Sequence, residues 1–196
     1  MNKKVLITGV SGQTGSYMLD YLLENTNHNI YGMVRRLSVP NYKNIQHNLN
    51  NKRFQLVTGD LSDYSSIEKL VREMQPDYVI NFAANSFVAT SWELPIQHFE
   101  LNAMGVLKFL EAIKKFKPDC RFYSSGSSEE DGKVSYSPQD LKHPPHPRSP
   151  YGCATVAARF IVQNYRESFN LYAIHCLCHN HESPTRGAEF VTKKIT

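Results

Sequence analysis

The chain reads Val5-Leu6-Ile7-Thr8-Gly9-Val10-Ser11-Gly12-Gln13-Thr14-Gly15 near its start, and this stretch decides the fold. Its first four residues predict a buried strand, Val5–Thr8, and the next segment with helical periodicity is Thr14–Leu23. Between them the G-x-x-G-x-x-G run lets the backbone turn tightly and approach a pyrophosphate, which would bind at the positive N-terminal end of the helix. The alternative is an ordinary strand-to-helix turn without a ligand.

The same alternation of strand and helix continues along the chain. The candidate strands are Val5–Thr8, Ile30–Val34, Phe54–Val57, Tyr78–Phe82, Arg121–Tyr123 and Leu171–Cys176. The candidate helices are Thr14–Leu23, Ser65–Met74, Glu100–Phe116 and Tyr151–Phe169. This order predicts an α/β fold with a doubly wound parallel sheet, Rossmann-like, over residues 1–196. Ser135–Pro150, which contains five prolines, is expected to be an irregular loop.

Composition limits the classes of partner. The 196 residues suit one domain, and 22 basic against 18 acidic residues give a net charge of +4 that is spread along the chain. This balance argues against a nucleic-acid or membrane partner, and no apolar stretch approaches the roughly 20 residues of a membrane helix. Four cysteines without a regular framework, and a start without a signal-peptide pattern, predict free thiols and a cytoplasmic location.

A doubly wound sheet binds its ligand outside the carboxyl ends of its strands. The segments that follow the predicted strands are Gly9–Gly15, Arg35–Arg36, Asp60–Leu61, Ala83–Ser86, Ser124–Glu129 and Cys178–Gly187. From the first four of these we expect the cofactor contacts to come from Gly9, Gly12, Gln13, Gly15, Arg35, Arg36, Asp60, Leu61, Ala83 and Ala84. Asp60 could accept a hydrogen bond from an adenine amino group, whereas Ser62 or Asp63 is the better candidate for a helix N-cap.

The end of the second strand bears on the choice of cofactor. A domain that prefers NAD usually has an acidic residue there to hold the ribose 2′-hydroxyl, but this chain has Arg35 and Arg36. Arginine can pair with a 2′-phosphate through its planar set of donors. We therefore expect NADP rather than NAD. The alternative is that both arginines lie on a solvated surface.

Several longer motifs connect the chain to a known family. They are Gly59-Asp60-Leu61, Asn81-Phe82-Ala83-Ala84-Asn85-Ser86, Ser127-Ser128-Glu129, Pro147-Arg148-Ser149-Pro150-Tyr151-Gly152 and Asn180-His181-Glu182-Ser183-Pro184. With the glycine run they stand in the order and spacing of the GDP-mannose 4,6-dehydratases, which are extended short-chain dehydrogenase/reductases. The chain resembles this family over almost its whole length, as far as Glu189-Phe190-Val191-Thr192.

The resemblance implies conversion of GDP-mannose to GDP-4-keto-6-deoxymannose with a nicotinamide cofactor that is recycled in place. By motif position the catalytic residues would be Ser127, Glu129 and Tyr151, of which Tyr151 would also contact the cofactor. The resemblance further implies substrate contacts from Ser86 and Asn180 and cofactor contacts from His181 and Arg186. It implies dimers or tetramers, and a C-terminal substrate domain that is largely missing here, with 178–196 as the start of the substrate-binding region.

Two departures from the family pattern affect the chemistry. The family has Tyr-x-x-x-Lys, and this chain has Thr155 where the lysine would lie beside Tyr151 on one helix face. That lysine lowers the phenol pKa and binds the nicotinamide ribose, so both functions should weaken. Arg159, one turn further along, could reach back only partly and is expected on the surface. Glu130 and Asp131 replace an apolar residue and a tyrosine, and a run of three carboxylates predicts a solvated face.

Other readings stay open at this stage. The chain could be a catalytically silent NADP-binding module or the partner of a full-length enzyme, which Thr155 favours. It could also be a 4-keto nucleotide-sugar reductase, which needs Tyr151 but not Glu129.

The run from His175 to His181 contains cysteines and histidines, but successive side chains of a strand alternate between faces, so no metal site is expected. His143 and His146, in the proline-rich loop, are expected on the surface.

Overall fold

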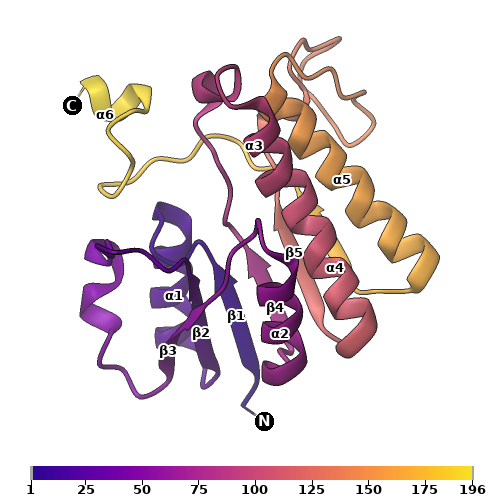
Figure 1. Ribbon diagram of the computed structural model, residues 1–196. Coiled ribbons are helices and arrows are strands. Elements are labelled where there is room, and N and C mark those ends of the chain that lie inside the picture. Colours follow the sequence, from indigo (N-terminus) through magenta and orange to yellow (C-terminus); the bar gives the residue numbers. More distant parts are fainter. Residues whose placement is uncertain (1, 196) are drawn as a thin grey trace.

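The computed structural model describes residues 2–195 and contains a six-stranded parallel sheet (Figure 1). Its strands are β1 (Lys4–Thr8), β2 (Asn29–Val34), β3 (Phe54–Thr58), β4 (Tyr78–Asn81), β5 (Arg121–Ser125) and β6 (Ala173–Cys176). Their order in the sheet is β3-β2-β1-β4-β5-β6, and every neighbouring pair is parallel. This is the strand order of a doubly wound dinucleotide-binding fold, so the predicted fold class is confirmed.

Helices cover both faces of the sheet. The α-helices are α1 (Gln13–Asn25), α2 (Tyr64–Met74), α3 (Pro95–Phe99), α4 (Gly105–Phe116), α5 (Pro150–Phe169) and α6 (Val191–Ile195). The shorter turns are η1 (Lys43–Asn48), η2 (Val88–Ser91), η3 (Glu100–Met104), which is a π-helix, and η4 (Ser128–Glu130). Figure 1 shows α2, α4 and α5 side by side on one face, and none of the helices described in residues 2–195 is long and apolar enough to cross a membrane.

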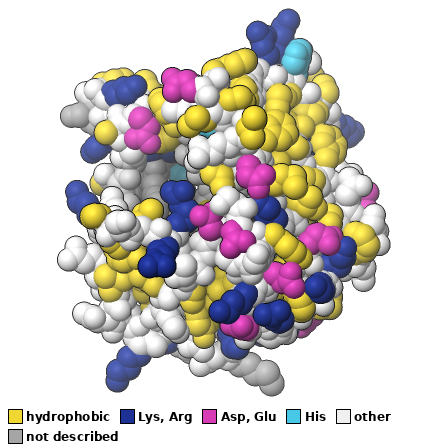
Figure 2. Space-filling view, in the orientation of Figure 1, with side chains coloured by type: hydrophobic (Ala, Val, Ile, Leu, Met, Phe, Trp, Pro, Cys, Tyr) yellow, Lys and Arg dark blue, Asp and Glu magenta, His cyan; other side chains and the backbone are white. Residues whose placement is uncertain are grey.

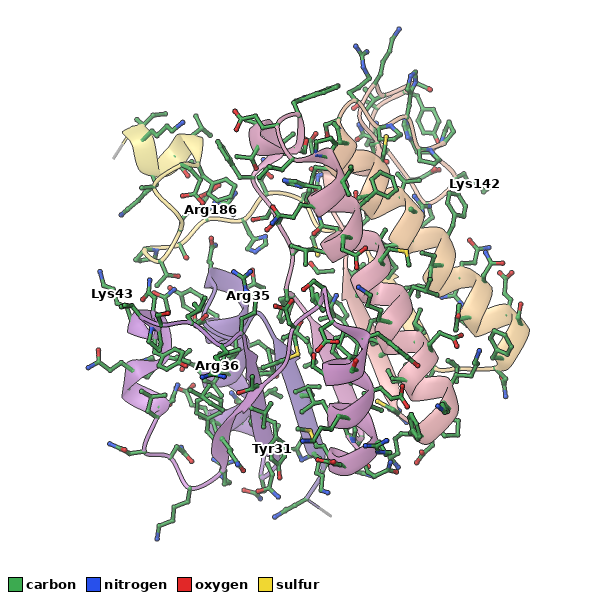
Figure 3. All side chains as sticks on the ribbon, viewed as in Figure 1. Tyr31, Arg35, Arg36, Lys43, Lys142 and Arg186 are labelled. Carbon is green, nitrogen blue, oxygen red and sulfur yellow. The ribbon has the colours of Figure 1, made fainter. Side chains whose placement is uncertain are left out.

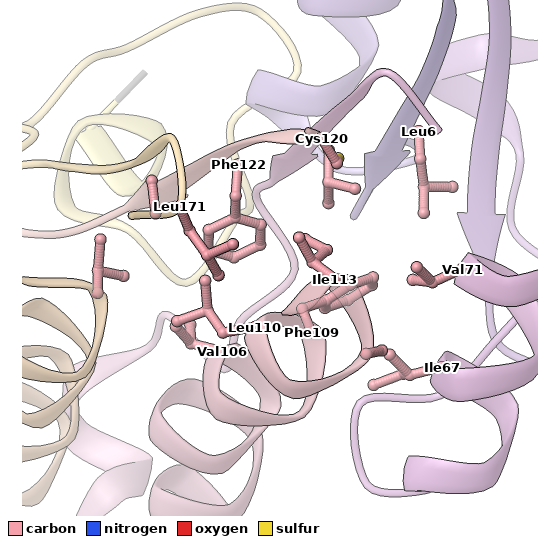
Figure 4. Close-up of a cluster of buried hydrophobic side chains, with 14 of the residues drawn as sticks. Leu6, Ile67, Val71, Val106, Phe109, Leu110, Ile113, Cys120, Phe122 and Leu171 are labelled. Atoms are coloured by element: carbon pink, nitrogen blue, oxygen red, sulfur yellow. The ribbon is translucent and has the colours of Figure 1, made fainter. Parts of the chain in front are cut away.

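The core divides into two hydrophobic clusters because strand side chains alternate between the faces of the sheet. On β1, Leu6 packs with Phe122 of β5 and with Phe109 and other residues of α2, α4 and α5 (Figure 4). Val5 and Ile7, its neighbours on β1, pack on the opposite face with residues of α1, β2 and η1. The central strand is therefore buried on both sides, as its uninterrupted apolar sequence requires.

The helical region predicted as Glu100–Phe116 begins earlier and is interrupted. Pro95 occupies the first turn of α3, where a missing N–H costs nothing, so the chain becomes helical five residues sooner. The π-helix η3 then joins α3 to α4. At α2 the carboxylate of Asp63 accepts from the N–H of Ser65, so Asp63, one of the two predicted candidates, is the N-cap.

The proline-rich segment has no helix or strand until Pro150, which begins α5. Ser149 caps this helix by accepting the N–H of Gly152. The prediction that His143 lies on the surface is wrong, because His143 is only 3% exposed and its Nε2 accepts from the N–H of Ser135. His146 is exposed, as expected.

The packing of α4 gives a test of the core. Phe109→Ala should destabilise the protein by about 3–5 kcal/mol, because a fully buried ring leaves a cavity beside Phe122. Phe160→Ala makes the same chemical change at a side chain that is 46% exposed, and should cost about 0.5 kcal/mol or less. Urea unfolding followed by circular dichroism measures both, and equal losses would contradict this division between core and surface.

Candidate functional site

Two adjoining pockets lie along the carboxyl edge of the sheet. The larger has a volume of about 560 Å³ and the smaller about 320 Å³, which is the usual range for small-molecule sites. Both are lined by Gly9, Gly12, Ala83 and Ala84, so they form one continuous crevice. Figure 2 shows a hollow on this face, between the C-terminal segment and the body of the domain.

Most of the candidate residues gather in this crevice. The smaller pocket is also lined by Arg35, Asp60 and Leu61. The larger pocket is also lined by Gln13, Gly15, Ser86, Ser127, Glu129, Tyr151, Asn180, His181 and Arg186. The structure does not bring Arg36 into either pocket, and its side chain is exposed.

The glycine turn has the shape that a bound pyrophosphate requires. Gly9 has φ of +64°, which is favourable only for glycine, and a Cβ on it would lie 2.9 Å from the backbone nitrogen of Ala83. A Cβ on Gly15 would clash with the carbonyl oxygen of Gly9. No side chain caps the N-terminus of α1 at Gly12, and its first turn contains no acidic residue. The helix end can therefore accept an anion.

At the other end of the crevice, the positive charge of Arg35 acts on the carboxyl group of Asp60. Partial burial opposes ionisation of Asp60, but hydrogen bonds from the N–H and hydroxyl of Ser62 outweigh it. With the nearby charge of Arg35, these bonds lower the pKa of Asp60. Figure 3 shows Arg35 at the end of β2, with Arg186 across the hollow on the C-terminal segment. A ligand in this region would meet both a cation and an ionised carboxylate.

The C-terminal segment crosses the start of α1. The Nε2 of His181 lies 2.7 Å from the Oγ1 of Thr14, and Gln13 donates to the carbonyl oxygen of His181 at 3.1 Å. Arg186 donates to Gln13 at 3.4 Å. These contacts fasten residues far apart in sequence over the glycine turn, so the segment forms one wall of the larger pocket.

The three candidate catalytic residues come from the end of β5 and the start of α5. Ser127 is the N-cap of η4, and its hydroxyl accepts the N–H of Glu129 at 3.2 Å. Tyr151 lies in the first turn of α5 and lines the same pocket as Ser127, whose side chain favours the phenolate. The segment Ser124–Glu129, expected at the ligand edge of the sheet, enters the crevice only in part, since Ser124 is completely buried and does not line either pocket.

The surroundings of Tyr151 disfavour its ionisation. Burial raises the pKa of this phenol, the side chain of Ser127 lowers it, and the charges of Glu130 and Glu129 raise it further, so the pKa lies above its ordinary value. His98 packs edge-on against the Tyr151 ring at 6.2 Å between centroids. Burial lowers the pKa of His98 below its ordinary value near 6.5, so at neutral pH it is an uncharged ring.

No charge comes from position 155. Thr155 is buried, and its hydroxyl donates to the carbonyl oxygen of Gly152 at 2.9 Å, within its own helix. The sequence predicted that Arg159 lies free on the surface. Its side chain is only 27% exposed, and its Nη1 lies 3.9 Å from the Oε2 of Glu130. The guanidinium is thus directed to a carboxylate and does not substitute for a cation at 155.

The prediction that the acidic run forms a solvated face is wrong for two of its three members. Glu130 is 0% exposed and Asp131 is 4% exposed. Each faces a histidine from a distant segment: His175 lies 2.8 Å from Glu130, and His143 lies 3.5 Å from Asp131. Sequence reasoning missed both contacts, because the only local signal, the acidic run, points to solvent. Among residues 2–195 no group of three or more His, Cys, Asp or Glu side chains could hold a metal ion.

Comparison with known proteins identifies the family. A family model described as GDP-mannose 4,6 dehydratase matches residues 6–196. A GDP-mannose 4,6-dehydratase of Vibrio cholerae is 43% identical, in an alignment that covers 100% of this chain and 54% of that protein. The Homo sapiens GDP-mannose 4,6 dehydratase is 40% identical over 97% of this chain and 53% of its own length. The chain therefore spans about half the length of these relatives.

Solved structures show the same architecture. A dTDP-glucose 4,6-dehydratase from Streptomyces venezuelae, solved with NAD and TYD bound, matches with a TM-score of 0.89 at 21% identity, over 97% of this chain and 60% of that one. A UDP-glucuronic acid 4-epimerase from Bacillus cereus, solved with UDP-glucuronic acid and NAD, matches with a TM-score of 0.77 at 28% identity. It covers 88% of this chain and 55% of that one.

The charge deficit beside Tyr151 can be tested directly. Thr155→Lys should lower the pKa of Tyr151, because a lysine one turn away favours the phenolate. Thr155→Met introduces a side chain about as long as that of lysine but without a charge, and should leave the pKa of Tyr151 high. Labelling with ¹³C-tyrosine and NMR titration measures the pKa, with the resonance assigned from Tyr151→Phe. Equal pKa values in the two variants would show that position 155 does not control this phenol.

Proposed function

Because the chain belongs to the GDP-mannose 4,6-dehydratase family, we propose that its crevice binds NADP and GDP-mannose and is arranged for the family's dehydration chemistry, at a rate that Thr155 greatly reduces. One observation carries this proposal. Ser127, Glu129 and Tyr151 line the same pocket as the glycine turn and as Asn180 and His181 from the C-terminal segment. A dinucleotide on the glycine turn would thus reach the three polar side chains that a sugar redox reaction needs.

The cofactor proposal follows the electrostatics of the crevice. The pyrophosphate would bind at the uncapped N-terminus of α1, where Gly9, Gly12 and Gly15 let the backbone approach. Arg35 would pair with a 2′-phosphate and Asp60 would accept from the adenine amino group. A nicotinamide group bound in the larger pocket would take a hydride from the sugar and later return it.

Each candidate catalytic residue has a defined task in this proposal. Tyr151 would remove the proton from the sugar 4-hydroxyl as the C4 hydride leaves, and Ser127 would donate a hydrogen bond to the C4 oxygen. Glu129 would remove the C5 proton, which is acidic beside the new ketone, so that water can leave across C5 and C6. Ser86 and Asn180, in the same pocket, would contact the sugar nucleotide.

A second candidate function is a catalytically silent NADP-binding module. The observation that favours it is the buried Tyr151, whose pKa is raised and whose neighbour at 155 is a threonine bonded to its own helix. In both proposals 178–196 is the start of the substrate-binding region. Both also allow a second copy of the chain, or a longer relative, to complete the site, because the matched relatives are about twice as long.

An assay separates the two candidates. The native chain, incubated with GDP-mannose and NADP, should form little or no 4-keto-6-deoxy product, because Tyr151 lacks a neighbouring cation. Thr155→Lys should increase product formation by about 100-fold or more, within the range typical of general base catalysis. Thr155→Met is the uncharged control, and mass spectrometry of the nucleotide sugars detects the product. No product from the lysine variant, with NADP still bound, would favour the silent module.

Cofactor choice has its own matched pair of variants. Arg35→Ala should weaken NADP binding by about 10-fold to 100-fold and leave NAD binding almost unchanged, because only NADP has the 2′-phosphate. Arg36→Ala removes the same charge at a position outside both pockets, and should have little effect. Isothermal titration calorimetry of the native chain and both variants with each dinucleotide measures the six affinities. Equal binding of NAD and NADP by the native chain would contradict the proposal.

A further inference from the structure

Behind the candidate catalytic residues lies a buried group of polar side chains that the proposed reaction does not use. We call it the Glu130 cluster, and its members are Ser124, Glu130, Arg159 and His175. The side chain of Glu130 is 0% exposed and that of His175 is 5% exposed. A buried carboxylate destabilises the folded protein unless it is hydrogen-bonded and paired, so the contacts that Glu130 makes need a structural explanation.

The connectivity of the cluster is that of a serine–histidine–glutamate triad. The Oγ of Ser124 lies 3.2 Å from the Nδ1 of His175, and the Nε2 of His175 lies 2.8 Å from the Oε1 of Glu130. A nucleophile must be open to its substrate, however, and Ser124 is completely buried. The histidine therefore orients the carboxylate, with its Nε2–H donating to Glu130 and its Nδ1 able to accept from Ser124.

The carboxylate that His175 orients also holds the backbone of a candidate catalytic residue. The Oε1 of Glu130 accepts the N–H of Ser127 at 3.0 Å, while the hydroxyl of Ser127 accepts from the N–H of Glu129. These two bonds form a capping box around η4. Gly126 leaves the room that this arrangement needs, because a Cβ there would clash with both His175 and Glu130.

The same carboxylate links the turn to the helix that carries Tyr151. Its Oε2 has no hydrogen-bond partner among the described residues and lies 3.9 Å from the Nη1 of Arg159 on α5. Glu130 thus contacts β6 through His175, α5 through Arg159 and its own turn through Ser127. Asp131 and His143, 3.5 Å apart, are the nearest comparable pair, but they hold the proline-rich loop and do not bond to Ser127.

We propose that Glu130, oriented by His175, is a positioning residue that holds Ser127 against Tyr151. This inference rests on the proposed function, in which Ser127 and Tyr151 act on the sugar C4 oxygen. It assigns to Glu130 an action through Ser127 and not a direct contact with substrate. Two effects on Tyr151 then have opposite signs: the charge of Glu130 raises the phenol pKa, and the side chain of Ser127, whose backbone Glu130 holds, lowers it.

Two variants of similar length separate these effects. Glu130→Gln removes the charge but keeps an oxygen that can accept the N–H of Ser127, whereas Glu130→Met removes both. In the Thr155→Lys chain, titrated by ¹³C-tyrosine NMR, the pKa of Tyr151 should therefore be about one unit higher in the Met variant than in the Gln variant. If the Met variant does not fold, Glu130→Leu supplies the same comparison with a more compact side chain.

The controls locate the effect. Asp131→Asn and Asp131→Leu make the matched pair of changes at a buried carboxyl on the same turn that does not bond to Ser127, so the pKa of Tyr151 should be about equal in these two variants. Adding Ser127→Ala should abolish the Gln–Met difference at Glu130, because the residue that transmits it is gone. Equal Tyr151 pKa values in the Gln and Met variants, or a difference that survives Ser127→Ala, would overturn the proposal. The titration needs neither substrate nor turnover, so its failure is distinct from failure of the proposed function.

Discussion

The parallel pairing of β1 with β2 on one side and β4 on the other is the constraint on which the crevice depends. It brings the carboxyl ends of the strands to one edge, and there the hydroxyl of Thr8 donates to Asn81 at 2.6 Å and accepts from the N–H of Ala83 at 3.0 Å. This bonded corner holds Ala83 against Gly9, where only a glycine fits. The glycine turn and the part of both pockets formed by Gly9 and Ala83 are therefore positioned by the same few hydrogen bonds of Thr8.

The fold could be predicted because its determinants are local and periodic. A strand of continuous apolar residues, a glycine at each position that requires one, and helices with one apolar face are visible in a short window of sequence. The helix that begins at Pro95 instead of Glu100 was missed because its first turn contains few apolar residues in helical register, and only the proline indicates a start. Packing against α5 then completes that region.

The candidate site was less predictable, because its character depends on contacts between distant residues. The sequence places Ser127, Glu129 and Tyr151 near the sheet edge by motif, and the structure gathers them in one pocket. The burial of Glu130 could not be anticipated, since its partner His175 lies 45 residues away and arrives through β6. A run of acidic residues predicts a solvent-exposed face, even where a distant strand buries those residues in the folded chain.

The residues that determine the fold are separate from those that determine the proposed chemistry. This separation explains how the two departures from the family pattern, at Thr155 and at Glu130, can persist. At neutral pH a phenol with a pKa of about 10 is ionised in only about one molecule in a thousand. Each further unit of increase removes another factor of ten. Thr155 stands where the family has a lysine, so the cation that would offset this is absent, and the negative charge of Glu130 raises the pKa of Tyr151 further. Neither change disturbs the apolar alternation of β1 or the glycines of the turn, because Thr155 satisfies its hydroxyl within α5 and Glu130 satisfies its Oε1 within its cluster. A crevice of this shape can thus remain intact while the ionisation of Tyr151, on which the first step of the proposed sugar chemistry depends, becomes less favourable.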